Sequence, residues 1–172
     1  MRSLFSILVL ALLVLAQTVS AQDDKTSRPS PPAEARAMVG EAVVSINYSA
    51  PAVKGRAVWG SLVPYGKVWR TGANEATVFE TSADLMINGQ KLPAGKYALF
   101  TIPGETEWTF IFNSVWEQWG AYRYDATKDV LRVTATPATS STFHERLTFH
   151  IHESKVSLMW ENLEVGFEAK SR

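Results

Sequence analysis

Apolar and polar residues alternate along most of this chain, and such alternation is typical of strands that bury one face. It predicts strands at residues 41–48, 77–81, 129–136, 142–152 and 155–161, with a short last strand at 165–168. Residues 96–102 and 108–113 are instead apolar at successive positions. Strands of that kind are buried on both faces, so we expect these two at the centre of a sheet.

The turns between these segments support a β fold. Residues 84–92 contain Asn88-Gly89, and a two-residue hairpin turn needs positive φ at both central positions, which this pair adopts readily. The helical candidate, 114–121, is about two turns long. The expected fold class is therefore all-β, a single antiparallel β-sandwich or flattened barrel of about eight strands.

The first 21 residues have the features of a secretory signal peptide. Arg2 precedes an apolar run at 4–16, and Val19-Ser20-Ala21 supplies the small residues of a cleavage site. A membrane anchor is the alternative, which is disfavoured because no long hydrophobic stretch follows. We expect cleavage near Ala21 and a periplasmic or secreted protein.

Amino-acid composition indicates how residues 22–170 are organised and excludes several classes of function. Residues 22–38 are polar and proline-rich, which predicts a disordered tether ahead of one folded domain at 39–170. The chain has 17 basic and 17 acidic residues, so nothing favours nucleic acid or an anionic membrane as a partner. Cysteine is absent, which excludes thiol nucleophiles, iron–sulfur clusters and thiolate zinc sites. No cofactor is expected.

A long segment without strand patterning, residues 49–75, separates the first two predicted strands. Structureless loops of more than about 15 residues are uncommon in compact domains and are usually functional or disordered. Its many apolar residues need burial, which argues against disorder. We therefore expect an ordered cover loop over one end or face of the sandwich, held by Val53, Val58, Trp59, Leu62, Val63, Val68 and Trp69.

Four stretches of the chain resemble the domain of unknown function 2911 family. They are KGRAVWGSLVPYGKVWRTGANEAT at 54–77, INGQKLPAGKYALFTIPGETEWTFIFN at 87–113, QWGAYRYDATKDVLRV at 118–133, and LMWEN ending at Asn162. The similarity covers about residues 41–168. The resemblance implies an exported bacterial protein with a compact β-rich domain. It brings no established activity, so no catalytic residue is carried over.

Polar and aromatic side chains of the cover loop form the first candidate site. Proteins hold sugars with amides and carboxylates beside flat aromatic faces, and arginine adds a planar fork for oxyanions. The structural alternative is that Arg70 bridges to Glu75 and Asn74 bonds a turn, so that the loop only stabilises the fold. The loop residues proposed for ligand binding are Arg56, Tyr65, Lys67, Trp69, Arg70, Asn74 and Glu75.

The segment WEQWGAYRY, residues 116–124, is dense in aromatic residues. Trp119 and Tyr122 are three residues apart, so one helical turn would place both on one face. They would then form a stacking wall for a ligand near Trp69. The alternative is that these rings close the open end of the sandwich, where aromatics bury a large area per residue.

Metal binding and catalysis find less support. His150 and His152 share a strand face, but they look outward and lack a third close ligand, and His144 is the remaining histidine, so no metal site is expected. Two paired carboxylates would suit glycoside hydrolysis. Nothing in the sequence pairs Glu75 with another acid such as Glu107, Asp125 or Glu161.

The function favoured by these patterns is an exported β-sandwich that binds a polar small molecule or a glycan. The second hypothesis is a structural or protein-interaction module of the cell envelope, and the third is a hydrolase acting on envelope or extracellular glycans. One observation separates the first two hypotheses: whether Arg70, Asn74 and Glu75 line an open cavity or are consumed by internal hydrogen bonds. The oligomeric state stays open.

Overall fold

The computed structural model describes residues 24–171, so the predicted signal peptide at 1–21 lies outside the described residues. The regular secondary structure of the described chain consists of two single 3-10 turns and ten strands. In order they are η1 (Lys25–Ser27), β1 (Pro32–Val39), β2 (Ala42–Ser49), β3 (Val78–Thr81), β4 (Leu85–Ile87), β5 (Gln90–Leu92), β6 (Gly95–Ile102), β7 (Trp108–Asn113), η2 (Ala126–Lys128), β8 (Asp129–Ala135), β9 (Ala138–His152) and β10 (Lys155–Ser171).

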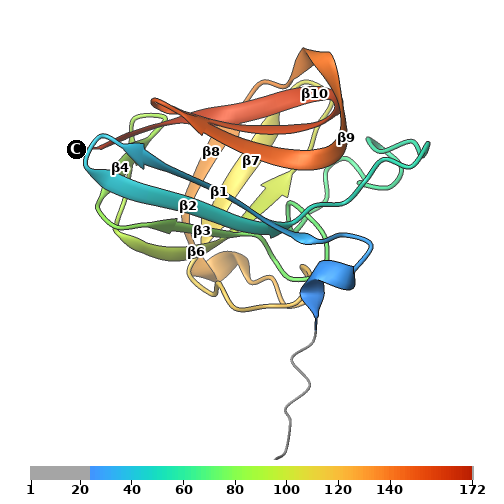
Figure 1. The fold of residues 1–172 in the computed structure, drawn as a ribbon. Helices are drawn as coiled ribbons and strands as arrows, with labels where there is room; N and C mark the ends of the chain where they lie inside the picture. Colours follow the sequence, from blue (N-terminus) through green and yellow to red (C-terminus); the bar gives the residue numbers. More distant parts are fainter. Residues whose placement is uncertain (1–23, 172) are drawn as a thin grey trace, which may run out of the picture.

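The strands form two antiparallel sheets that pack face to face, so the predicted all-β sandwich is confirmed (Figure 1). The larger sheet has the order β1-β2-β3-β6-β7-β8, and the smaller one has the order β5-β4-β10-β9. Alternate residues of both sheets meet in one core: Ile46 of β2, Phe112 of β7 and Leu158 of β10 are all fully buried. In the described chain no helix is long and apolar enough to cross a membrane.

Strands β6 and β7 lie inside the larger sheet, as their continuous apolar sequence predicts. Leu99 and Phe112 face the core between the sheets. Phe100 and Ile111 point to the opposite, outer face, yet they are also fully buried. A second small apolar cluster therefore forms on the outer face, and the connection between β7 and η2 covers it with Ala121 and Tyr124.

The segment predicted as a disordered tether is ordered from residue 24 onward, which corrects that expectation. Strand β1 pairs along its whole length with β2. Ala33, Ala35 and Ala37 pack against the core, while Glu34 and Arg36 face outward. Alanine gives a weak apolar signal, so this strand depends on backbone pairing to β2 rather than on a visible hydrophobic pattern.

The helical candidate at 114–121 is wrong, because this segment is irregular. Its backbone groups bond to another part of the chain instead of to each other. Ala76 N donates to Gln118 O at 3.0 Å, and Gly120 N donates to Asn74 O at 3.0 Å. Gly120 also has a φ of +66°, which is incompatible with a right-handed helix.

The hairpin prediction is confirmed. Asn88 and Gly89 have φ values of 46° and 79°, and they join the paired strands β4 and β5. Asn88 also ties this turn to two other strands, since its Nδ2 donates to Thr134 O at 3.0 Å and its Oδ1 accepts from Glu168 N at 2.8 Å. The short strand predicted at 165–168 is part of the long β10.

The cover loop, residues 49–75, is ordered and packed, as predicted. Backbone bridges join Ala52 to Arg146 of β9 and Trp69 to Thr101 of β6. Trp59 and Trp69 enter an aromatic cluster with Trp160 of β10, where the Trp69 and Trp160 rings stack at 6.0 Å. Leu62 departs from the expectation, because it stays 41% exposed.

Candidate functional site

A cavity of about 470 Å³ opens on the outer side of the larger sheet. Its floor is the end of β2 and the start of β3, and its walls come from the end of the cover loop, from the N-terminal residues 24–32, and from the segment after β7. The residues that line it are Lys25, Pro32, Asn47, Tyr48, Ser49, Glu75, Ala76, Val78, Trp116, Glu117, Gln118 and Trp119.

The first wall is the aromatic loop, which we define as residues 114–125. Asn113, fully buried at the end of β7, anchors its start. Asn113 Nδ2 donates to Asp125 O at 2.9 Å and to Asp129 Oδ1 at 2.8 Å, and its Oδ1 accepts from Val115 N at 3.0 Å. One amide therefore holds both ends of the loop together.

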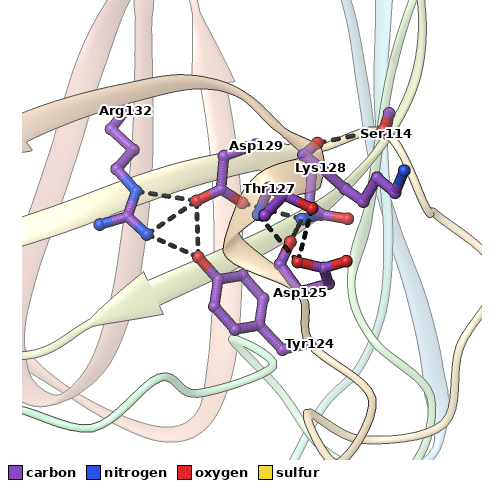
Figure 2. Close-up of polar contacts among 8 residues, drawn as sticks. Ser114, Tyr124, Asp125, Thr127, Lys128, Asp129 and Arg132 are labelled. Carbon is purple, nitrogen blue, oxygen red and sulfur yellow. Dashed lines mark hydrogen bonds and ion pairs between the residues drawn. The ribbon is translucent and has the colours of Figure 1, made fainter.

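A second polar cluster fixes the far end of the aromatic loop (Figure 2). Tyr124 Oη donates to Asp129 Oδ2 at 2.6 Å, and Arg132 donates to both, from Nε to Asp129 Oδ2 at 2.8 Å and from Nη2 to Tyr124 Oη at 2.7 Å. Burial is the largest cause, and the hydrogen bond to Asp129 the next largest, of a rise in the pKa of Tyr124 to about 12. Tyr124 is thus neutral at physiological pH and holds the end of the aromatic loop in place, and its ring packs on Phe100.

The second wall is the end of the cover loop, which lies alongside the aromatic loop. The two backbone hydrogen bonds between residues 74–76 and 118–120 align the segments. The backbones of Glu75 and Trp119 are paired there as an isolated antiparallel β-bridge. A glutamate and a tryptophan from distant parts of the sequence therefore meet at the cavity.

Glu75 is the ion-paired carboxylate among the residues that line this cavity. Arg28 Nη1 lies 3.0 Å from its Oε1 and 3.1 Å from its Oε2, and Lys25 Nζ lies 3.0 Å from Oε1. Burial alone would raise the pKa of Glu75. A backbone hydrogen bond and the donors Lys25 and Arg28 outweigh that effect and lower the pKa to about 2. The carboxylate is therefore ionised at neutral pH.

The third wall is the N-terminal arm, residues 24–31. Asn74 Nδ2 donates to Ser30 O at 3.1 Å, and Ala50 N donates to Pro31 O at 2.8 Å. The guanidinium of Arg28 lies 5.9 Å from the ring centroid of Trp119. In Figure 1 the turn η1 sits beside the connection between β7 and β8. The arm thus completes the cavity from a part of the chain predicted to be disordered.

Two tryptophans give the cavity flat apolar faces. Trp116 is 39% exposed and Trp119 is 56% exposed, which is high for tryptophan and leaves ring surface open to a ligand. Lys96 Nζ lies 5.1 Å from the Trp116 ring centroid, a cation–π distance. Lys96 and Arg28 thus each contact one of the two rings.

The structure brings some of the predicted site residues together and separates others. Glu75 and Trp119 line the cavity, and Asn74 holds its wall. Trp69 instead belongs to the core, where its Nε1 donates to Gly72 O at 3.1 Å. Arg56 bonds the cover loop itself, through Val53 O and Ala52 O. Both residues thus lie outside the cavity, and their side chains hold the cover loop itself.

Four further predicted residues lie outside the cavity. Tyr65 packs beside Gly60, and Lys67 is exposed. Tyr122 is 87% exposed, so it is not part of the aromatic wall that a helix would have made. Arg70 does not pair with Glu75 within the described chain, because Arg28 and Lys25 occupy that carboxylate.

Whether Arg70, Asn74 and Glu75 line a cavity or are used in internal hydrogen bonds was to separate ligand binding from a structural role, and the three residues differ in this respect. Glu75 lines the open cavity, but its oxygens are also engaged by two cations. Asn74 is consumed by internal hydrogen bonds to Ser30 O and Ser49 Oγ. Arg70 does neither: it lies outside the cavity, and its Nε is enclosed without an acceptor.

Sequence reasoning missed several lining residues. Trp116 belongs to the aromatic-dense segment but not to the predicted helical pair. Asn47 is an exposed polar position in the alternating pattern of β2, which was the available signal. No sequence pattern indicated that Lys25 would line a site, since it belongs to the segment predicted to be a disordered tether. Within residues 24–171 no group of three or more His, Cys, Asp or Glu residues could hold a metal ion.

Comparisons with known proteins identify a family and no activity. The model of the family described as "Protein of unknown function (DUF2911)" matches residues 30–169. This match starts just ahead of β1, so it includes the strand that the sequence pattern concealed. No curated protein and no solved structure matches the chain.

Proposed function

The chain belongs to the DUF2911 family of proteins of unknown function, and from its own cavity we propose that it binds a polar small molecule or a glycan. The observation that carries this proposal is the joining of Trp116, Trp119 and the ionised Glu75 in one open cavity. A volume of about 470 Å³ lies in the range of small-molecule sites, which are roughly 300–1,000 Å³.

The polar groups of the cavity suit hydroxyls. Glu75 accepts hydrogen bonds, and Lys25 and Asn47 can donate them. The two cations beside Glu75 balance the charges of Glu75 and of Glu117, the other carboxylate that lines the cavity, so the cavity has no strong preference for a charged ligand. The indole faces of Trp116 and Trp119 suit the apolar C–H face of a sugar ring. Hydroxyl-rich ligands of neutral charge therefore fit this chemistry well.

Hydrolysis is less well supported. A general acid needs a raised pKa so that it carries a proton at working pH. The pKa of Glu75 is instead lowered to about 2. Glu117 also lines the cavity, but it is an exposed residue at the rim. We therefore propose binding without catalysis.

A structural or protein-interaction role in the cell envelope is the second candidate. It is favoured by the internal bonds of Asn74 and by the ion pairs of Glu75, which stabilise the fold whether or not a ligand binds. Both candidates place the protein outside the cytoplasm, because residues 1–21 have the pattern of a signal peptide. Protein recovered after export should begin at Gln22.

The test is a thermal-shift and calorimetric screen of residues 22–172 against neutral mono- and oligosaccharides. A ligand at 100 times its dissociation constant adds about 2.7 kcal/mol of stability, which is easily measured. We expect Trp119→Ala to weaken binding at least tenfold. Phe143→Ala removes an aromatic ring of similar exposure on β9, away from the cavity, and should bind like the wild type.

The proposal fails if no saccharide raises the melting temperature, or if Phe143→Ala weakens binding as much as Trp119→Ala does. Failure of saccharides together with capture of an envelope protein through the Trp116–Trp119 surface would support the interaction role instead.

A further inference from the structure

Arg70 is a partly buried cation without a partner in the part of the chain that the structure describes. It makes no ion pair and no side-chain hydrogen bond with the described residues, and its Nε is enclosed by protein without an acceptor. Its two terminal nitrogens also lack acceptors, but they are not enclosed, so they reach solvent. Taking a charge out of water without a partner is costly. An unsatisfied group of this kind is typical of a binding site.

Arg70 differs from other arginines of the described chain in being partly buried without an ion pair or a side-chain hydrogen bond. Arg28 and Arg132 bind carboxylates, and Arg56 and Arg146 donate to backbone carbonyls. Arg123 also lacks a partner among the described residues, but it is exposed and pays no desolvation cost.

Tyr122 lies within electrostatic range of this guanidinium. The pKa of Arg70 is lowered, chiefly by burial. The Tyr122 ring packs against Gly120, where a Cβ atom would lie 2.9 Å from a ring carbon. Trp119 and Tyr122 are both exposed, and they lie on either side of the buried Gly120 in the sequence of the aromatic loop. Apart from this contact with Gly120, most of the Tyr122 side chain is open, at 87% exposure.

Arg70 is tied to the same cavity wall from the other side. Its carbonyl oxygen accepts from Thr77 N at 3.1 Å, immediately after the lining residue Ala76. Ala76 N in turn donates to Gln118 O of the aromatic loop. Arg70 and Tyr122 thus extend from the two segments that together form the wall beside Trp119.

We propose that Arg70 and Tyr122 form a second subsite, which binds a carboxylate-bearing sugar unit while a neighbouring unit occupies the cavity. The ligand would then be an acidic oligosaccharide. The planar fork of arginine matches a carboxylate, and the open tyrosine face supports a sugar ring. This inference rests on the proposed function, and it adds the charge and the minimum length of the ligand.

The experiment is titration calorimetry on residues 22–172 with tetrasaccharides of galacturonate and of mannuronate. Each is measured beside its carboxyl-reduced neutral form and its monosaccharide, and a sulfated neutral tetrasaccharide is added as a further arm. We expect at least one acidic tetrasaccharide to bind ten times more tightly than its neutral form. Arg70→Lys should remove this preference, and the matched control Arg123→Lys should keep it.

Tyr122→Ala provides a second variant that removes only exposed surface and leaves the fold intact. It should weaken binding of both tetrasaccharide forms several-fold and leave monosaccharide binding unchanged. Equal affinity for acidic and neutral forms, or an Arg70→Lys protein that keeps the preference, would overturn the subsite while saccharide binding itself stands. Preference for the sulfated form alone would overturn the carboxylate assignment. Absence of binding to every saccharide would overturn both proposals.

Discussion

Arg28 binds Glu75 through one nitrogen placed almost equally between the two carboxylate oxygens, at 3.0 and 3.1 Å. The two residues are 47 positions apart, and their contact attaches the N-terminal arm to the cover loop at the rim of the cavity. The same guanidinium lies over Trp119. One ion pair therefore positions the carboxylate, the arm and an aromatic wall together.

Glu75 should make the stability of the domain dependent on pH in the acid range. Its pKa is about 2 in the folded protein and 4.5 ordinarily. Because the folded pKa is the lower one, the ionised group stabilises the fold fully above about pH 5, and this contribution is lost as pH falls toward 2. The carboxylate is partly exposed, so we expect a screened contribution of about 1–2 kcal/mol.

Glu75→Gln should therefore unfold at lower denaturant than the wild type at pH 7, and the two proteins should converge near pH 2. Urea unfolding at several pH values measures this. Glu117→Gln is the matched control, since Glu117 lines the same cavity without an ion pair among the described residues. A constant difference between Glu75→Gln and wild type across the acid range would contradict the electrostatic explanation.

Asn113→Ala should destabilise the domain by about 2–3 kcal/mol, because it removes a fully buried amide and its hydrogen bonds to Val115 N, Asp125 O and Asp129 Oδ1. We also expect the aromatic loop to loosen, with a shift in tryptophan fluorescence and faster amide exchange at Gly120. Asn162→Ala, at a solvent-exposed position of β10, should be close to neutral. An Asn113→Ala protein with unchanged exchange in the loop would show that other contacts hold the wall.

Gly89→Val should destabilise the β4–β5 hairpin by about 1–2 kcal/mol. No atom of residues 24–171 lies within 4 Å of a Cβ atom built at Gly89, so the cost would come from its φ of +79°. Gly89→Asn is the control, because asparagine tolerates the left-handed region. Thermal unfolding of both variants measures the difference, and equal melting temperatures for Val and Asn would count against backbone strain.

The parts of the fold that could be predicted are those set by local pattern. Strands β6 and β7 are apolar at successive positions, and Asn88-Gly89 specifies a turn whatever surrounds it. Strand β1 could not be predicted in this way, since it is held by pairing with β2 and its inward residues are alanines. Its ordering is a tertiary effect that overrides a polar, proline-rich composition.

The candidate site was predictable in part for the same reason. The composition of the cover loop and the aromatic loop pointed to Glu75 and Trp119, which do meet. The partner of Glu75 could not be predicted, because Arg28 comes from the arm and takes the place expected for Arg70. The supposed helix at 114–121 failed because its backbone bonds to residues 74–76, a contact that no local pattern encodes.

Arg70→Met should leave the domain as stable as the wild type or more stable by about 0.5–1 kcal/mol. Methionine keeps an apolar stem that can fill the space of the arginine side chain, and it removes a partly buried charge that has no partner in the described chain. Such a gain would mean that arginine is retained at this position for a reason other than stability, as expected for a binding residue. Urea unfolding at pH 7 measures the change, with Arg123→Met as the exposed control on the aromatic loop. A loss of more than about 1 kcal/mol on Arg70→Met alone would show that the guanidinium stabilises the fold, and Arg70 would then have to be removed from the proposed subsite.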